Sequence, residues 1–165
     1  MSVNYNYYFG YGSNLNHSHM SRRCPNAKFI APMTVHNWKL VFRGVADIEP
    51  SRGSKVIGGL WKISKRCELA LDGYEGFPFL YGKGVMVTDI GGVDHNVMTY
   101  IMQQHDCIKP PSDMYLETIE QGYEDCGLPK SQLSKAVEES YEDRTGQPIA
   151  GFSWGIPRPK NNGGI

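Results

Sequence analysis

The sequence predicts an α+β fold in which a small mixed sheet curls into a partly closed β-barrel flanked by short helices. Two observations lead to this prediction. Apolar residues repeat with a period of two over residues 28–63, and further strand-like runs follow between residues 81 and 104. A helical period is clear only after the Pro110-Pro111 pair. Many strands with few, short helices argue against a doubly wound parallel sheet and favour a curled one.

The chain begins with an aromatic run that suits a central strand. Residues 5–9 are rich in tyrosine and are followed by Gly10, a usual boundary residue. The next turn leads into a predicted short helix over residues 15–23, for which Ser13 or Asn14 would be the cap. A Cys-Pro pair ends this helix, because proline disfavours helical geometry in the residue before it.

Alternation of apolar and polar side chains continues through the middle of the chain. It is clear over residues 37–43 and again in a run over residues 55–63. The adjacent glycines Gly58-Gly59 lie inside the second run, where we expect a bulge or a sharp bend. Ser64 is then predicted to cap a short helix that ends near Gly73.

A strand pair followed by two helices is predicted for the second half of the chain. The runs over residues 81–90 and 97–104 would pair through a Gly-Gly turn. Ser112 caps the first helix, whose apolar residues lie three or four positions apart until Gly127 ends it. In the second helix apolar residues are spaced by four, and we expect this helix to end near Gly146.

The predicted organisation is a single domain over residues 1–146 and a tail over residues 147–165. A chain of 165 residues matches the usual size of one hydrophobic core. The tail is rich in Pro, Gly and Asn, and Phe152 and Trp154 could dock it on the domain.

The composition excludes several classes of function. The 17 basic and 17 acidic side chains give a formal net charge of zero, which provides no field to hold nucleic acid or an anionic membrane. No run of about 18 apolar residues is present, and the first residues do not resemble a secretion signal. The four cysteines lie far apart, as is typical of reduced thiols. We therefore expect a cytoplasmic protein with a small-molecule partner, neither nucleic acid nor membrane.

The glycine-rich turn after the first strand is one candidate site. Gly10 and Gly12 resemble the start of a dinucleotide-binding motif, but Leu15 occupies the third glycine position and no acid follows at the usual spacing. The backbone N–H groups of residues 12–15 could instead hold a carboxylate or an oxyanion. Taken alone, a turn of this kind is more often purely structural.

Glu75 is the second candidate, because it stands among aromatic residues at a helix-to-strand junction. Burial among apolar groups disfavours the ionised carboxylate, so a glutamate there would have a raised pKa and could transfer protons near neutral pH. The alternative is an exposed loop glutamate or a salt bridge at the end of a helix.

Histidines and cysteines form no recognisable site. His17 and His19 have no third ligand at a suitable spacing, so we expect no metal. Cys24 and Cys107 belong to no nucleophile motif and are expected to be inert thiols. Tyr115 lies in the first turn of a predicted helix, where packing alone would explain it.

Seven short motifs nevertheless resemble, in order and over residues 5–141, those of the gamma-glutamylcyclotransferase family. These motifs are Phe9-Gly10-Tyr11-Gly12-Ser13-Asn14-Leu15, Trp38-Lys39-Leu40-x-Phe42, Gly58-Gly59-Leu60-Trp61-Lys62-Ile63, Leu71-Asp72-x-x-Glu75-Gly76, Tyr100-Ile101-Met102, Pro110-Pro111-Ser112-x-x-Tyr115 and Cys126-Gly127-Leu128-Pro129. Each motif is weak alone, but the ordered set is specific.

The resemblance implies a gamma-glutamylcyclotransferase-like fold and activity, in which a gamma-glutamyl amide closes to 5-oxoproline and releases an amine or amino acid without metal or cofactor. Glu75 would then be the catalytic acid and base. The resemblance places the substrate at the turn and at two tyrosines, so that the implied binding residues are Tyr11, Gly12, Ser13, Asn14, Leu15, Tyr81 and Tyr115. The protein would be a monomer or a homodimer.

Departures from the family pattern leave the substrate open. Gly10 stands where relatives commonly carry Ala, and the segment from Glu75 to Tyr81 resembles the branch that acts on gamma-glutamylamines. The Gly-Ser-Asn turn resembles instead the branch that acts on gamma-glutamyl amino acids. Two other functions remain: a non-catalytic module that binds a small metabolite, and cleavage of a different amide-like or glycosidic bond.

Overall fold

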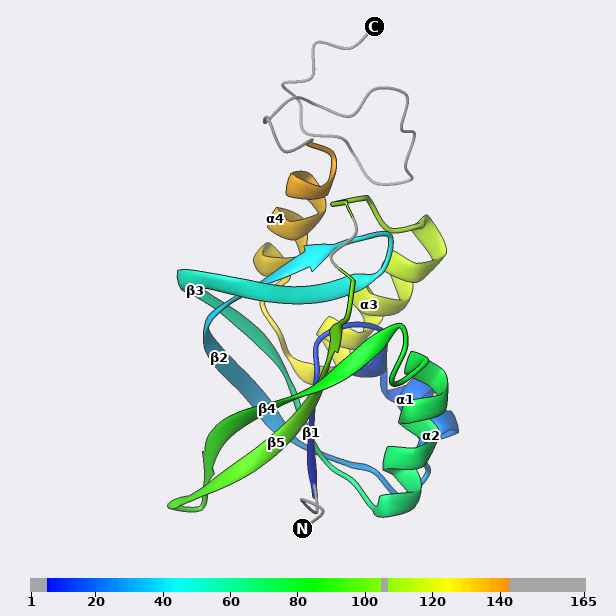
Figure 1. Cartoon of the computed structure of the whole chain (residues 1–165), viewed down its shortest axis with the longest axis vertical. Helices are drawn as coiled ribbons and strands as arrows, with labels where there is room; N and C mark the ends of the chain where they lie inside the picture. The colour runs from blue at the N-terminus through cyan, green and yellow to red at the C-terminus, as the bar shows by residue number, and fades with distance from the viewer. Residues whose placement is uncertain (1–5, 105–106, 143–165) are drawn as a thin grey trace, which may run out of the picture.

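The computed structural model describes residues 6–104 and 107–142 and is an α+β fold built on one five-stranded sheet (Figure 1). The strands lie in the order β2-β3-β1-β5-β4, and all neighbours are antiparallel except β1 and β5. Their bounds are β1 Tyr7–Gly10, β2 Lys28–Phe42, β3 Ala46–Lys62, β4 Tyr81–Ile90 and β5 Val93–Met102. The predicted mixed sheet with a central first strand is confirmed.

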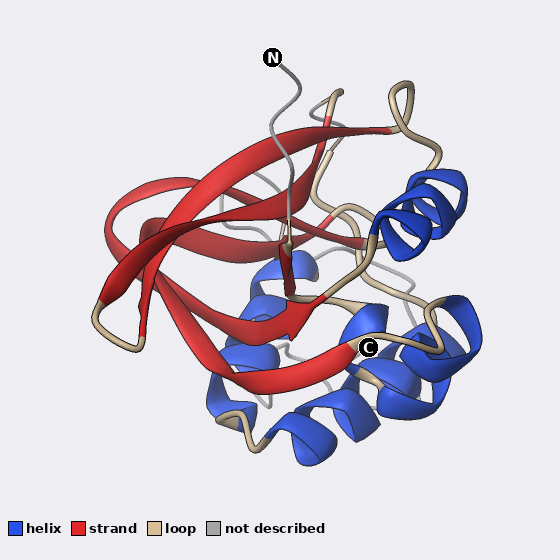
Figure 2. Cartoon of the chain, turned by 90° about the horizontal axis from the view of Figure 1, so that it is seen from below, coloured by secondary structure: helices blue, strands red, loops and turns tan. Residues whose placement is uncertain are grey.

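The sheet is strongly curved, and in the view of Figure 2 helices lie to its right and below it. It does not form a closed β-barrel. The two hairpins, β2–β3 and β4–β5, are joined through the short strand β1, and their outer strands β2 and β4 do not pair with each other. The curvature therefore leaves an open sheet, flanked by helices as the sequence predicts.

The helices begin at capping residues that the sequence largely identifies. Ser64 and Ser112 cap the second and third α-helices, because their hydroxyls accept hydrogen bonds from the N–H groups of Cys67 and Tyr115. Gly127 ends the third helix with a left-handed φ of 68°. The bounds are η1 Ser13–Leu15, α1 His17–Arg23, α2 Lys65–Glu75, α3 Asp113–Cys126 and α4 Lys130–Ser140.

Three helix boundaries differ from the prediction: the start of α1, the end of α2 and the end of α4. Residues 13–15 form a separate 3₁₀ turn, so the cap of α1 is Asn16, whose side chain accepts from the N–H of His19 at 3.0 Å. Helix α2 continues through Gly73 and ends at Gly76, which takes the left-handed φ of 64°. This extension places Glu75 at the last position of a helix rather than in a loop.

Gly58 and Gly59 form no bulge, contrary to expectation. The register of the β2–β3 pair shifts elsewhere, at Ile30 of β2 and where Asn37, whose φ is 65°, lies opposite residues 51–54 of β3. Gly58 is needed for close packing, since a Cβ there would lie 2.3 Å from the carbonyl oxygen of Gly10 and 2.5 Å from the ring of Phe9. The glycine thus lets β3 approach the end of β1 closely.

Strand β1 separates two apolar cores, because neighbouring strand residues face opposite sides of a sheet. Phe9 packs in one core with Leu116 and Ile119 of α3, while Tyr8 packs in the other with Met20 of α1 and with Leu71 of α2. The two cores cover both faces of the strand, so its end is held rigidly where the turn at residues 11–14 begins.

Parts of the prediction fall on residues outside the described ranges. They include Phe152, Trp154 and the proposed boundary between domain and tail, which stay predictions. The predicted end of the last helix near Gly146 is wrong, because α4 already ends at Ser140 and is capped by Tyr141. Within the described ranges, no helix has the length and apolar character to cross a membrane.

Candidate active site

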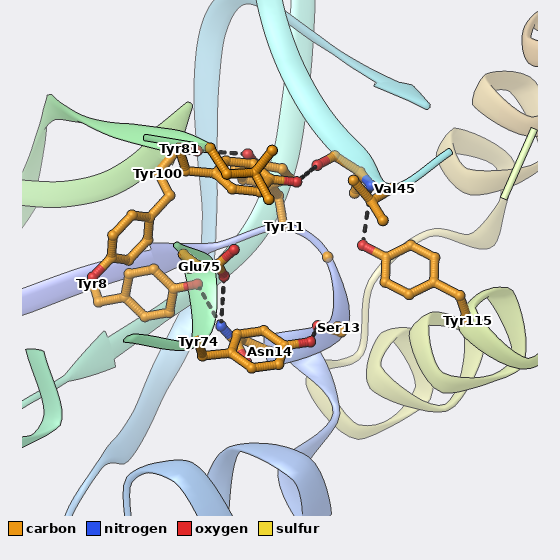
Figure 3. A pocket seen from close by; sticks show the side chains of 13 residues that line it. Tyr8, Tyr11, Ser13, Asn14, Val45, Tyr74, Glu75, Tyr81, Tyr100 and Tyr115 are labelled. Carbon is orange, nitrogen blue, oxygen red and sulfur yellow. Dashed lines mark hydrogen bonds between the residues drawn. The ribbon is translucent and has the colours of Figure 1, made fainter. Parts of the chain in front are cut away.

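A cavity of about 200 Å³ opens where β1 meets the turn that follows it (Figure 3). Its walls carry one carboxylate, Glu75, and an unusual number of phenol rings. These are the rings of Tyr8, Tyr11, Tyr74, Tyr81, Tyr100 and Tyr115. They come from β1, the turn, α2, β4, β5 and α3, so segments far apart in sequence build one small cavity.

All of the predicted site residues except Leu15 line this cavity. The N–H of Leu15 donates to the carbonyl of Gly12 at 3.0 Å, and its side chain is fully buried in the core. The reason is the 3₁₀ turn, which pairs this N–H internally and points the side chain away from the cavity. The first N–H groups of a helical turn have no partner within it, which leaves those of Ser13 and Asn14 for a ligand.

Glu75 occupies the last position of α2, and Figure 3 shows its carboxylate directed into the cavity beside Asn14. The side-chain amide nitrogen of Asn14 donates to Oε1 of Glu75 at 3.2 Å. Burial raises the pKa of the Glu75 carboxyl to about 7, and the positive charge of Arg23 partly opposes this rise. Both protonation states of Glu75 are therefore populated near neutral pH.

Asn14 connects this carboxylate to its surroundings. Besides its bond to Glu75, the amide nitrogen donates to the hydroxyl of Tyr8 at 3.0 Å. The amide oxygen accepts from Nη1 of Arg23 at 2.9 Å. The Asn14 side chain, which is almost fully buried, thus has a partner at both polar atoms.

Three of the tyrosine hydroxyls donate hydrogen bonds to other atoms of the protein. Tyr11 donates to the backbone oxygen of Tyr100 at 2.5 Å, and Tyr81 donates to that of Ala46 at 2.8 Å. Tyr100 donates to Oδ1 of Asp72 at 2.6 Å. These bonds hold the rings in place as walls of the cavity.

Two other hydroxyls act as acceptors and keep a proton to donate. Tyr115 accepts from the N–H of Ala46 at 3.0 Å, and Tyr8 accepts from Asn14. Burial raises the pKa of both phenols above the usual value, so each remains neutral and able to donate. With the N–H groups of the turn, they form a set of donors that suits an anion or a developing oxyanion.

Sequence reasoning missed Tyr8, Tyr74 and Tyr100 as cavity residues. Tyr74 precedes Glu75 directly, and its hydroxyl lies 3.0 Å from Oγ of Ser13. The position of Tyr100 follows from the pairing of β1 with β5, which no local pattern reveals. Tyr8 could have been predicted only from the alternation of side chains between the two faces of β1.

The histidines and cysteines assemble no second reactive site in the described part of the chain. Sγ of Cys126 lies 3.4 Å from Nε2 of His17, a pair that the sequence did not suggest. Burial raises the pKa of the Cys126 thiol to about 12, so it stays protonated and is a poor nucleophile. Across residues 6–104 and 107–142, no three His, Cys, Asp or Glu side chains gather as metal ligands.

Comparison with known proteins points to one family. The model of the family described as "Gamma-glutamyl cyclotransferase, AIG2-like" matches residues 8–122. The human gamma-glutamylcyclotransferase is 30% identical over 154 residues, which span 85% of this chain and 81% of the human protein. The mouse gamma-glutamylcyclotransferase is 29% identical and is matched over 79% of this chain and 78% of its own length.

Solved structures show the same fold. The structure of a gamma-glutamyl cyclotransferase superposes with a TM-score of 0.70 at 24% identity, over 93% of both chains. A crystal structure of an uncharacterized human protein superposes with a TM-score of 0.69 at 26% identity, over 89% of this chain and 90% of that one.

Proposed function

The chain belongs to the gamma-glutamyl cyclotransferase, AIG2-like family and is an enzyme of the gamma-glutamylcyclotransferase type, and from this premise we propose that Glu75 carries the proton transfers of its reaction. The substrate would be a gamma-glutamyl amide and the products 5-oxoproline and a free amine or amino acid. The observation that carries the proposal is a single carboxyl group with a pKa of about 7 in a cavity otherwise lined by neutral groups.

The substrate brings its own nucleophile. Its α-amine attacks the γ-carbonyl carbon and closes a five-membered ring, while the carbonyl π electrons move to the oxygen. Collapse of this tetrahedral intermediate breaks the bond to the leaving nitrogen and restores the carbonyl. Because the attack is intramolecular, the enzyme has to fold the substrate into the reactive conformation rather than collect two reactants.

Proton transfer is the part that requires Glu75. The attacking nitrogen becomes acidic as the new C–N bond forms, and the ionised carboxylate accepts its proton. The same carboxyl group then returns a proton to the leaving nitrogen, which could not depart as an amide anion. A pKa near the working pH suits a group that must both accept and donate.

Charge on the tetrahedral oxygen needs donors that are already in place. The N–H groups of Ser13 and Asn14 and the hydroxyls of Tyr8 and Tyr115 are the available donors around Glu75. We assign them jointly to the oxyanion and to the α-carboxylate of the glutamyl group. Their fixed positions mean that little reorganisation accompanies the reaction.

A panel of gamma-glutamyl amino acids, gamma-glutamyl amines and glutathione tests the proposal, with 5-oxoproline detected by mass spectrometry. The wild-type protein should release it from at least one class, which identifies the leaving group. Glu75→Gln should be folded and inactive, whereas Glu120→Gln, on the exposed face of α3, should keep full activity. Near-normal turnover by Glu75→Gln would overturn the mechanism.

A further inference from the structure

Arg23, the last residue of α1, is not a wall of the cavity but contacts two residues that are. Its Nη1 donates to the side-chain oxygen of Asn14 at 2.9 Å. Its guanidinium carbon also lies 3.5 Å from the centre of the Tyr74 ring, in a cation–π contact. Both partners touch catalytic or turn residues, since Asn14 bonds to Glu75 and Tyr74 bonds to Ser13.

The guanidinium determines which way the Asn14 amide faces. An arginine can only donate hydrogen bonds, so the amide oxygen must point to Arg23. The amide nitrogen then points to Glu75 and Tyr8 and uses both of its hydrogens there. A rotated amide would place its oxygen against the Glu75 carboxylate and its NH₂ group against a cation. Arg23 makes that arrangement unfavourable.

The charge of Arg23 is also available to Glu75, because no acid of residues 6–104 or 107–142 neutralises it. Within the described residues, this half-buried guanidinium forms no ion pair with a carboxylate. Asp47 and Asp72 raise the pKa values of cavity tyrosines, but each forms an ion pair with another base, Asp47 with Arg43 and Asp72 with Lys83. The other titratable groups facing Glu75 are neutral phenols, whose pKa values are raised by burial: Tyr8, Tyr11, Tyr81, Tyr100 and Tyr115.

We propose that Arg23 is a positioning residue of the cyclotransferase reaction, which holds the Asn14 amide and the Tyr74 ring so that Glu75 and Ser13 face the substrate in the reactive arrangement. This inference rests on the function proposed above. Arg23 acts through its neighbours and does not touch the reacting atoms. A purely structural arginine at a helix end would instead interact only with the last carbonyls of α1.

Three variants separate these roles. Arg23→Met removes the hydrogen-bond donors and the charge of the guanidinium. Arg23→Lys keeps the charge but cannot contact the Asn14 oxygen and the Tyr74 ring at the same time. Arg22→Met is the matched control, because Arg22 is the exposed neighbour on the same helix turn. The two readouts are kcat/KM as a function of pH and the pH titration of the Glu75 carboxyl carbon by ¹³C NMR. The NMR signal of this carbon is identified as the one that is missing from the spectrum of Glu75→Gln.

Arg23→Met should lower kcat/KM by about 10- to 100-fold, the usual effect of misplacing a reacting group. It should also raise the pKa of Glu75 above the wild-type value of about 7, because an opposing positive charge is lost. Arg23→Lys should keep the Glu75 pKa close to wild type and still lose activity. Arg22→Met should change neither quantity.

A double variant tests the route of the effect. If Arg23 acts through Asn14, Arg23→Met should lower kcat/KM by a smaller factor in an Asn14→Ala background than in the wild type. An equal factor in both backgrounds, or wild-type kinetics and an unshifted Glu75 titration in Arg23→Met, would overturn the proposal. Should the wild-type protein release no 5-oxoproline, the proposed function fails, and the NMR titration still decides whether Arg23 controls the ionisation of Glu75.

Discussion

Replacing Glu75 by Gln should abolish turnover and at the same time stabilise the folded protein at and above neutral pH. The wild-type carboxyl is buried, and ionising it there is costly. A glutamine has nearly the same shape, carries no charge, and can accept the hydrogen bond from Asn14 with its own side-chain oxygen. The catalytic requirement and the stability requirement therefore oppose each other at this position.

The size of the effect follows from the shift in pKa. Burial raises the pKa of Glu75 from 4.5 to about 7, so between these values the folded protein binds a proton that the unfolded chain has released. The stability that this proton provides is fully present below pH 4.5 and is lost as the pH rises to 7. At about 1.36 kcal/mol per pKa unit, the loss is about 3 kcal/mol in the wild type and absent in Glu75→Gln.

Urea unfolding of both proteins from pH 5 to pH 8, followed by tryptophan fluorescence, measures this difference. Trp38 and Trp61 lie in β2 and β3 and report on the sheet. The free energy of unfolding of Glu75→Gln minus that of the wild type should increase by about 2 to 3 kcal/mol up to pH 7 and then level off. A difference that does not vary with pH would refute a raised pKa for Glu75.

Further predictions concern the turn, the α3 tyrosine and the close strand approach. Ser13→Ala removes the bond to the Tyr74 hydroxyl and should raise KM more than it lowers kcat, as steady-state kinetics would show; an unchanged KM would argue against a substrate role for this turn. Tyr115→Phe leaves the N–H of Ala46 without its acceptor, so we expect weaker substrate binding and about 1 to 3 kcal/mol lower stability by denaturant titration, and wild-type values in both would contradict the assignment. Gly58→Ala should destabilise by about 1 to 3 kcal/mol or more in the same titration, because the added methyl group meets backbone; a neutral effect would show that β3 can move.

Local patterns were sufficient to predict most of the secondary structure. The period-two runs, the caps Ser64 and Ser112 and the end at Gly127 all depend on interactions within a few residues. Two of the helix boundaries that were predicted wrongly, the start of α1 and the end of α2, lie where two or more neighbouring residues could serve as the cap. Gly73 and Gly76 can both end a helix, and it is Gly76 that takes the left-handed conformation and ends α2.

The candidate site was only partly accessible from sequence. Family motifs indicated the turn and Glu75, because each of them lies within a short continuous stretch of the sequence. The arrangement around them is non-local: Arg23 reaches Asn14 across the end of α1, and Tyr100 reaches the cavity because β5 pairs with β1. Such partners are determined by the topology of the sheet and not by spacing in the sequence.

The most direct test of intramolecular cyclisation is the isotopic composition of the product formed in H₂¹⁸O. When the α-amine of the substrate is the nucleophile, all oxygen atoms of 5-oxoproline come from the substrate, so mass spectrometry should find it unlabelled and find no glutamate. If water were the nucleophile, the product would be glutamate with one ¹⁸O in its γ-carboxylate. That result would contradict the role assigned to Glu75 as the group that moves protons between the attacking and leaving nitrogens.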